Sequence, residues 1–125
     1  MKKITLLLLL VISTTVFSQD SEMKSIHLFD LPKEFTEKQY LDKIEKLNSF
    51  FIEAGFGKNY SLYKVEDTEI RIKYKYFLVS NYKSIEDYNK KHIISEDYNK
   101  FMDDFKKEYS ELIESEIYRK VILIN

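Results

Sequence analysis

The apolar residues of this chain recur with a spacing that changes between that of a strand and that of a helix. The order of these changes constrains the fold more than any other feature of the sequence. Helical spacing predicts one helical region after Thr36 and another after Ser84. Alternation and short apolar runs predict strands at residues 25–31, 60–65, 70–79 and 117–124. The predicted order of elements is therefore strand, helix, strand, strand, helix, strand.

The first helical region has a clear start and a clear end. Thr36 and Gln39 have the spacing of a capping box, in which each side chain satisfies a backbone N–H group of the other residue. Gly55 is placed to end the helix in a left-handed conformation. Between them an apolar stripe faces the predicted core: Tyr40, Leu41, Ile44, Leu47, Phe51 and Ala54.

A short repeat occurs in the second helical region. The segment Glu-Asp-Tyr-Asn-Lys at residues 86–90 returns at residues 96–100, and each copy closely follows a serine. Serine is a favoured N-cap. We interpret the repeat as two successive helix starts, at Ser84 and Ser95, separated by a break near residues 92–94. A functional tandem motif is the alternative.

In a single layered domain this order gives an α+β fold of the ferredoxin-like type, β-α-β-β-α-β. Its four-stranded antiparallel sheet carries both helices on one face. A sheet whose other face is solvated alternates apolar and polar residues. Residues 77–79 and 121–124 do not alternate, so both faces of these strand ends require cover. A second subunit is the simplest cover, and we expect a homodimer.

The chain resembles the dimeric α/β-barrel superfamily, whose small domains pair their sheets face to face. The resemblance rests on the element order, on the strand at residues 74–80 that leads into residues 84–88, and on the apolar last strand. It implies a dimeric α/β barrel. The superfamily includes haem-degrading and quinone-forming monooxygenases, dehydratases and many members without a known activity, so the resemblance leaves the function open.

The N-terminus has the three parts of a secretory signal: Lys2 and Lys3, then an apolar run, then a small residue at the cleavage site, Ser18. The apolar run spans about 14 residues, fewer than the roughly 20 that cross a bilayer, which argues against an uncleaved anchor. We therefore expect cleavage after Ser18, a single mature domain at residues 19–125, and a periplasmic or secreted protein with no stable membrane anchor. The chain has no cysteine, which excludes a lipid-anchored lipoprotein.

The composition of the mature domain disfavours nucleic acid as a partner. Without Lys2 and Lys3, 18 basic residues stand against 21 acidic ones, a net charge of −3. Proteins that bind nucleic acid usually carry a basic patch instead. The sequence also shows no phosphate-binding glycine loop, no nucleophile motif and no cluster of metal ligands. We expect no metal site and no cofactor.

The two histidines are candidate ligand-binding residues. His92 lies at the break in the second helical region, and the resemblance makes it notable because haem-binding relatives use a helix histidine as an axial ligand. Such relatives also carry an asparagine and a tryptophan in the pocket, and this chain has no tryptophan. A surface histidine is the alternative for His92. His27 alternates with apolar residues on the first strand, where a pocket role competes with a structural one.

Tyrosines are the most distinctive residues, with ten in the chain. Tyr74 and Tyr76 are predicted to share one face of a strand, and Tyr60 and Tyr63 lie on its hairpin partner. Tyrosine combines an apolar body with a polar tip, which suits the wall of a ligand pocket. It is also a common residue of half-buried strands. Tyr60, Tyr74 and Tyr76 are the tyrosine candidates.

Two classes of function follow. The first is non-catalytic binding of a small apolar ligand or an envelope partner by an exported domain. The second is a small monooxygenase or haem-handling enzyme of the dimeric α/β-barrel type. The missing tryptophan and the scarcity of histidine favour the first class. A purely structural dimer is not distinguishable from it by sequence.

Overall fold

The computed structural model describes residues 22–66 and 73–124. The predicted signal sequence and the first residues of the predicted strand at 70–79 lie outside these ranges. The elements, in chain order, are β1 (Met23–Phe29), α2 (Glu37–Glu53), β2 (Tyr60–Lys64), β3 (Tyr76–Tyr82), α3 (Ile85–Lys91), α4 (Glu96–Glu108), α5 (Ser110–Ser115) and β4 (Ile117–Ile122).

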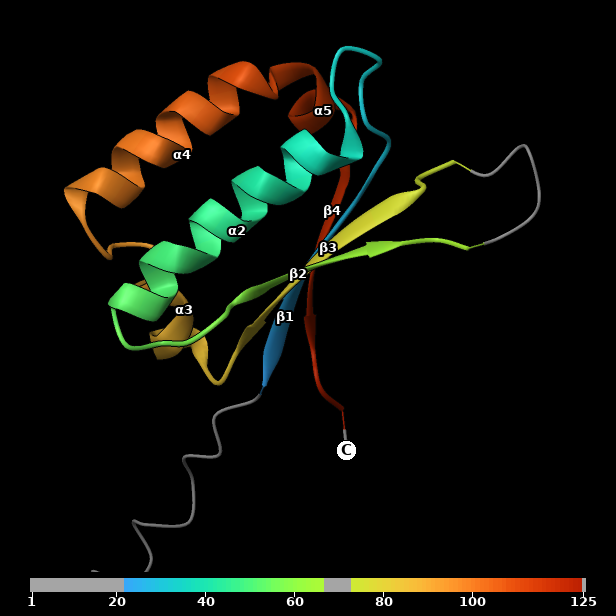
Figure 1. The fold of residues 1–125 in the computed structure, drawn as a ribbon. Helices are drawn as coiled ribbons and strands as arrows, with labels where there is room; N and C mark the ends of the chain where they lie inside the picture. The colour runs from blue at the N-terminus through green and yellow to red at the C-terminus, as the bar shows by residue number, and fades with distance from the viewer. Residues whose placement is uncertain (1–21, 67–72, 125) are drawn as a thin grey trace, which may run out of the picture.

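The four strands form one antiparallel sheet in the order β2-β3-β1-β4. Figure 1 shows the helices together on one side of this sheet. The arrangement is the predicted ferredoxin-like fold, in which each β-α-β unit is split by a strand from the other unit. The predicted second helical region comprises α3, α4 and the additional short helix α5.

The helix starts expected from the sequence are confirmed. Thr36 and Gln39 form the full capping box of α2. The hydroxyl of Ser84 accepts from the N–H of Asp87, and the hydroxyl of Ser95 accepts from the N–H of Tyr98. Each cap satisfies a donor that the first turn would leave free. The repeat therefore marks two helix starts. Gly55 follows the C-cap of α2 with a φ of 86°, as expected.

The predicted start of the third strand is wrong. The strand β3 begins at Tyr76, and Tyr74 before it has a φ of 61°, which a strand residue does not adopt. The carboxylate of Asp30 accepts from the N–H of Tyr74 at 3.2 Å and from that of Lys75 at 2.9 Å. These bonds hold the chain in a turn, so Tyr74 does not share a strand face with Tyr76.

The core lies between the sheet and the helices and is rich in aromatic rings. Tyr40 of α2 is at its centre: its ring lies 5.0 Å from that of Phe29 on β1 and 5.3 Å from that of Tyr109, at an edge-to-face angle of 82°. Such pairs add about 0.5–1.5 kcal/mol each beyond area burial. The other buried apolar residues include Ile44, Leu47, Phe51, Leu78, Phe105 and Leu112.

The opposite face of the sheet is also largely apolar. Strand alternation and register place one row of four side chains on this face, one from each strand, and two more apolar residues lie beside the row. In this row the ring of Tyr63 stacks on the ring of Phe77, with centroids 4.9 Å apart. We call these residues the open-face patch: Tyr63, Phe77, Leu28, Ile117, Ile26 and Val79.

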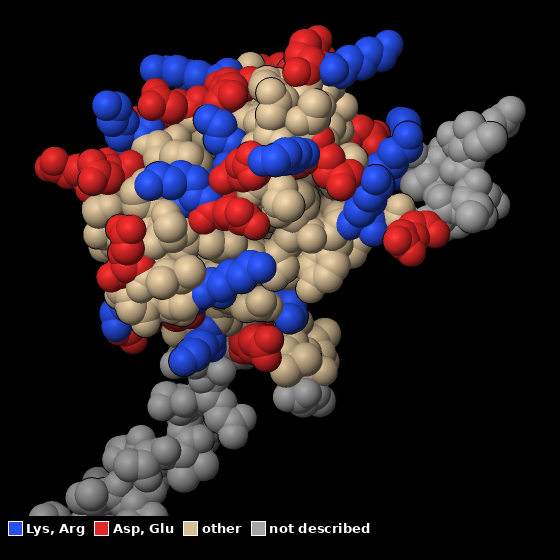
Figure 2. Space-filling model, in the orientation of Figure 1, with Lys and Arg blue, Asp and Glu red and all other residues tan. Residues whose placement is uncertain are grey.

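Charged side chains of both signs are interspersed over the face that Figure 2 shows. Within the described ranges, this view presents no continuous basic area of the kind that binds a phosphate backbone. No helix in the described part of the chain has the length and hydropathy needed to cross a membrane.

Candidate ligand-binding cleft

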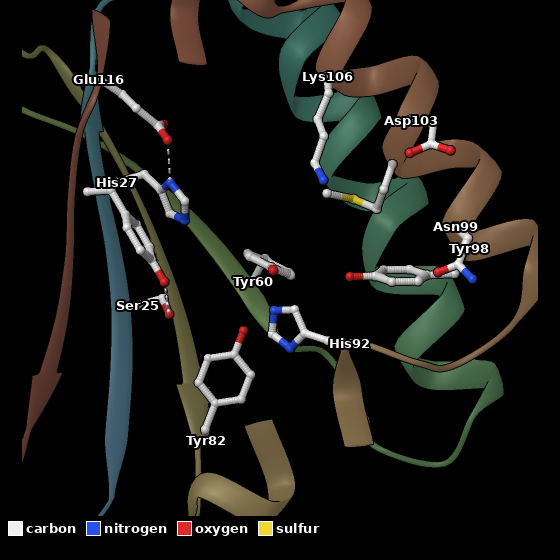
Figure 3. A pocket seen from close by; sticks show the side chains of 12 residues that line it. Ser25, His27, Tyr60, Tyr82, His92, Tyr98, Asn99, Asp103, Lys106 and Glu116 are labelled. Carbon is white, nitrogen blue, oxygen red and sulfur yellow. Dashed lines mark hydrogen bonds and ion pairs between the residues drawn. The ribbon is translucent and has the colours of Figure 1, made fainter. Parts of the chain in front are cut away.

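A cleft opens between α4 and the helix-facing side of the sheet (Figure 3). It comprises an outer mouth of about 680 Å³ and an adjoining inner chamber of about 180 Å³. Residues from β1, β2, α4 and the junction of α5 and β4 line both volumes: His27, Tyr60, Met102, Lys106 and Glu116. The two volumes therefore form one site with two parts.

The inner chamber is apolar. Its walls come from α2, β3, α4 and α5, and they include the rings of Tyr40 and Phe105. The other apolar residues of the wall are Ile44, Leu47, Leu78, Leu112 and Ile113. An apolar cavity of roughly 150 Å³ can remain dry and bind benzene, so this chamber has the size for one small ring.

The outer mouth is polar, with hydroxyl, imidazole, amide and charged groups. Figure 3 shows the side chain of Lys106 extending from α4 into the space between helix and sheet. Asn99 and Asp103 lie on the same helix near the rim, and both are exposed. The other polar residues that line the mouth are Ser25, His27, Tyr60, Tyr82, His92, Tyr98, Glu116 and Tyr118.

His27 is held by Glu116. Its Nδ1 lies 3.0 Å from a carboxylate oxygen of Glu116, and the two side chains are 24% and 13% exposed. Because an ionised carboxylate only accepts, Nδ1 carries the proton and donates it. In the neutral imidazole the second ring nitrogen, Nε2, is then an acceptor. Figure 3 shows this nitrogen on the side of the cleft. The ring of Tyr118 covers one face of the imidazole with centroids 4.6 Å apart.

His92 is fixed by its own helix. It is the C-cap of α3, and its Nδ1 lies 2.6 Å from the carbonyl oxygen of Tyr88, to which it donates. The ring of Tyr88 lies 4.1 Å away by centroid. His92 thus reaches the outer mouth from the break between α3 and α4. Its exposure agrees with the interpretation as a surface histidine, and its lining of the mouth agrees with a ligand role.

Tyr60 is positioned by a buried amide. The side chain of Asn48 on α2 accepts from the N–H groups of Asn59 and Tyr60 and donates to the carbonyl of Tyr60. These bonds fix the start of β2 against α2. Burial raises the pKa of Tyr60 well above its ordinary value, so its hydroxyl stays protonated at neutral pH.

Tyr82 and Tyr98 face the same space from β3 and α4. The hydroxyl of Ser80 donates to that of Tyr82 at 3.1 Å. Burial raises the pKa of Tyr98 to about 12. Protonated phenol groups both donate and accept, so these walls offer adaptable hydrogen bonds at neutral pH.

The structure brings together three of the five candidate residues: His27, Tyr60 and His92 line the cleft. Tyr74 lies in the turn before β3 and does not line it. Tyr76 lies on the helix side of the sheet but donates its hydroxyl to Glu37 at 2.9 Å, away from the cleft.

Sequence reasoning missed Tyr82, Glu116 and the contribution of α4. Tyr98, Met102 and Lys106 recur every four residues and therefore share one helix face. This spacing was a usable signal, although the apolar members of that stripe suggested a core. Nothing local marks Glu116, because its partner His27 lies 89 positions earlier in the chain.

The chain matches no protein-family model and no curated protein. Solved structures with a matching fold include the crystal structure of a dimeric ferredoxin-like protein of unknown function from Thermobifida fusca. That match has a TM-score of 0.51 and 12% sequence identity, and it covers 87% of this chain and 97% of the other. The likeness, together with the observed strand order, shows that this chain has the ferredoxin-like fold.

Proposed function

We propose that this protein is an exported homodimeric domain that binds a small apolar ligand, without chemical change, in the cleft between α4 and the sheet. One observation carries the proposal: the apolar inner chamber opens into a mouth lined by hydroxyl and imidazole groups. Binding sites for small molecules combine an apolar lining with a few convergent polar groups in this way. The ligand is therefore apolar at one end and polar at the other.

The open-face patch supports the homodimer. Its six residues are partly exposed in the isolated chain although they are apolar. Full burial of one such side chain contributes about 1.5–3 kcal/mol, so covering the patch can offset an association cost of several kcal/mol. A twofold pairing of two sheets places the same patch on both sides of the interface. The Thermobifida fusca protein of similar fold is itself described as dimeric.

Export is supported by the sequence of residues 1–18, with its basic start, apolar run and small residue at the cleavage site. An exported domain meets its ligand in the cell envelope or the medium. The alternative partner is another envelope protein that docks on the open-face patch. The oligomeric state of the purified protein distinguishes this partner from a second copy of the chain.

Filling the cleft tests the ligand proposal. Met102 lines both the chamber and the mouth, so Met102→Trp places an indole where the ligand would lie. Ile52→Trp is the matched control, because Ile52 is 57% exposed on α2 and lines neither volume. The readout is fluorescence of the neutral apolar probe N-phenylnaphthylamine.

We expect the unmodified protein and Ile52→Trp to bind the probe equally. Met102→Trp should bind it at least about tenfold more weakly, a difference of about 1.4 kcal/mol. Circular dichroism would verify that all three proteins are folded. Equal binding by Met102→Trp and the unmodified protein would remove the cleft as the binding site.

A haem-handling enzyme is the second candidate, and one observation favours it. His92 donates its Nδ1 proton to a backbone carbonyl, which is how metal-binding histidines are commonly oriented, and Asn99 lines the same mouth. The missing tryptophan argues against it. We expect no sharp Soret shift when haemin is titrated into the protein. A shift that His92→Ala abolishes would favour the enzyme.

A further inference from the structure

We infer that the ligand of this cleft is a phenol, bound with its ring in the inner chamber and its hydroxyl donating to Nε2 of His27. This inference rests on the proposed binding function and names the chemical class of the ligand. Three features of the site carry it: where His27 lies, which way its ring is polarised, and what surrounds the chamber.

His27 lies at the junction of the two parts of the cleft. It lines the apolar chamber and also the polar mouth, as does its partner Glu116. When a ligand fills the chamber, its atom at the junction of chamber and mouth therefore lies next to His27 and Glu116. The chamber has room for one ring, and the polar atom bonded directly to that ring would lie at the junction.

The pair sets the hydrogen-bonding role of the junction. Since Glu116 fixes a proton on Nδ1, Nε2 of the neutral imidazole is an acceptor, and it lies on the side of the cleft. No hydrogen bond to Nε2 is formed by any residue in the described ranges. Covering this acceptor with an apolar ligand atom would cost its hydration without replacement, whereas an O–H donor on the ligand replaces it. The site thus selects a hydroxyl over an ether or a hydrocarbon.

The chamber walls favour an aromatic ring as the carrier of that hydroxyl. The rings of Tyr40 and Phe105 lie 6.0 Å apart and both line the chamber. Aromatic rings gain from edge-to-face and offset contacts with one another. Lys106 also lines both parts of the cleft. A phenol that donates a hydrogen bond to His27 gains electron density on its oxygen, and the positive charge of Lys106 favours this change.

The same pair also links two strands, because His27 is on β1 and Glu116 precedes β4. A test must therefore separate recognition from folding. Para-cresol and para-methylanisole differ only in that the second carries a methyl group in place of the hydroxyl hydrogen. Water solvates the phenol better than the ether, so an apolar cavity without an acceptor would favour the ether.

The experiment compares the two probes by equilibrium dialysis at about pH 8, where free para-cresol remains protonated and an ordinary imidazole is neutral, so that its second nitrogen can accept. We expect the unmodified protein to bind the phenol at least about tenfold more tightly than the ether, which is the size of one good hydrogen bond. In His27→Phe the ether should still bind and the preference for the phenol should vanish. In Glu116→Gln the amide can donate to Nδ1 and place the proton on Nε2, so the preference should fall there too.

Each outcome is decisive. Tight binding of both probes without preference would leave the proposed function standing and overturn the phenol. A preference that persists in His27→Phe would also overturn it. Failure of both probes to bind would refute the proposed ligand site together with this inference.

Discussion

His27 on β1 and Glu116 at the end of α5 form a 3.0 Å hydrogen bond across 89 positions of sequence, at the point where an apolar chamber meets a polar mouth. The bond joins the central strand β1 to the entrance of the edge strand β4. It also orients an imidazole toward the cleft. The packing of the sheet edge and the chemistry of the candidate site therefore depend on the same two side chains.

The oligomeric state is predicted to depend on the open-face patch. Val79→Lys places a charge in the middle of that patch, next to Ile26 on the neighbouring strand. Burying an unpaired ammonium group between two sheets costs several kcal/mol, so we expect a monomer, or aggregation, in place of the dimer. Light scattering after size exclusion measures the mass.

The control for that variant is Ile52→Lys, which introduces the same charge on α2, away from the open face. It should remain dimeric like the unmodified protein at micromolar concentration. A monomeric unmodified protein would contradict the dimer proposal, and so would a dimeric Val79→Lys.

Stability is predicted to fall in acid partly through Asp87. Its carboxylate accepts from the N–H of Lys83 at 2.8 Å and pairs with Lys91 at 3.1 Å. Burial raises the pKa of Asp87, but these partners outweigh burial and hold the pKa below its ordinary value. Because the folded-state pKa is the lower one, the contribution is present above the ordinary carboxyl pKa and is lost as the pH falls through the lowered one.

Asp87→Asn should therefore destabilise the protein at neutral pH by about 1–3 kcal/mol, since a hydrogen-bonded charge is lost and the 9%-exposed Lys91 loses its carboxylate partner. The difference from the unmodified protein should shrink as the pH is lowered. Urea unfolding at a series of pH values measures both. Asp42→Asn, which removes an exposed pair with Lys38, should change little. A difference that stays constant into acid would show that the carboxylate charge of Asp87 does not matter.

Local signals in the sequence predicted the helices well and the turns poorly. The starts of α2, α3 and α4 depend on a side chain and an N–H group three positions apart, so Thr36, Ser84 and Ser95 identify them. Tyr74 was assigned to a strand because its neighbours alternate. Its turn is fixed by Asp30, which lies 44 positions away and carries no sign of this role in the sequence.

The candidate site was predicted only in part, because local signals mark some of its residues and long-range contacts place the others. The polar residues His27 and His92 and the tyrosine-rich hairpin drew attention to three of the lining residues. Tyr82 and Glu116 reach the cleft only because β3 and β4 flank β1 in the sheet, and strand order is a property of the whole fold. The chamber itself arises from the way α4 packs over the sheet, which residue spacing does not specify.

Processing of the N-terminus is predicted to leave Gln19 as the first residue. The physical reason is the short apolar run ahead of Ser18, which a signal peptidase can remove and which is too short to anchor the chain. Intact mass spectrometry of the exported protein measures the end, including a cyclised Gln19. A mature protein that still contains residues 6–10 would contradict export by cleavage.

The ligand is proposed to lie between α4 and the sheet, and not on the apolar open face. Amide and methyl NMR shifts of the labelled protein, followed during titration with para-cresol at about pH 8, distinguish these two positions. The largest changes are expected at the chamber residues Leu47, Leu78, Met102 and Leu112, with little change at Val79 or Ile26. Changes confined to Val79, Ile26 and the rest of the open-face patch would contradict it.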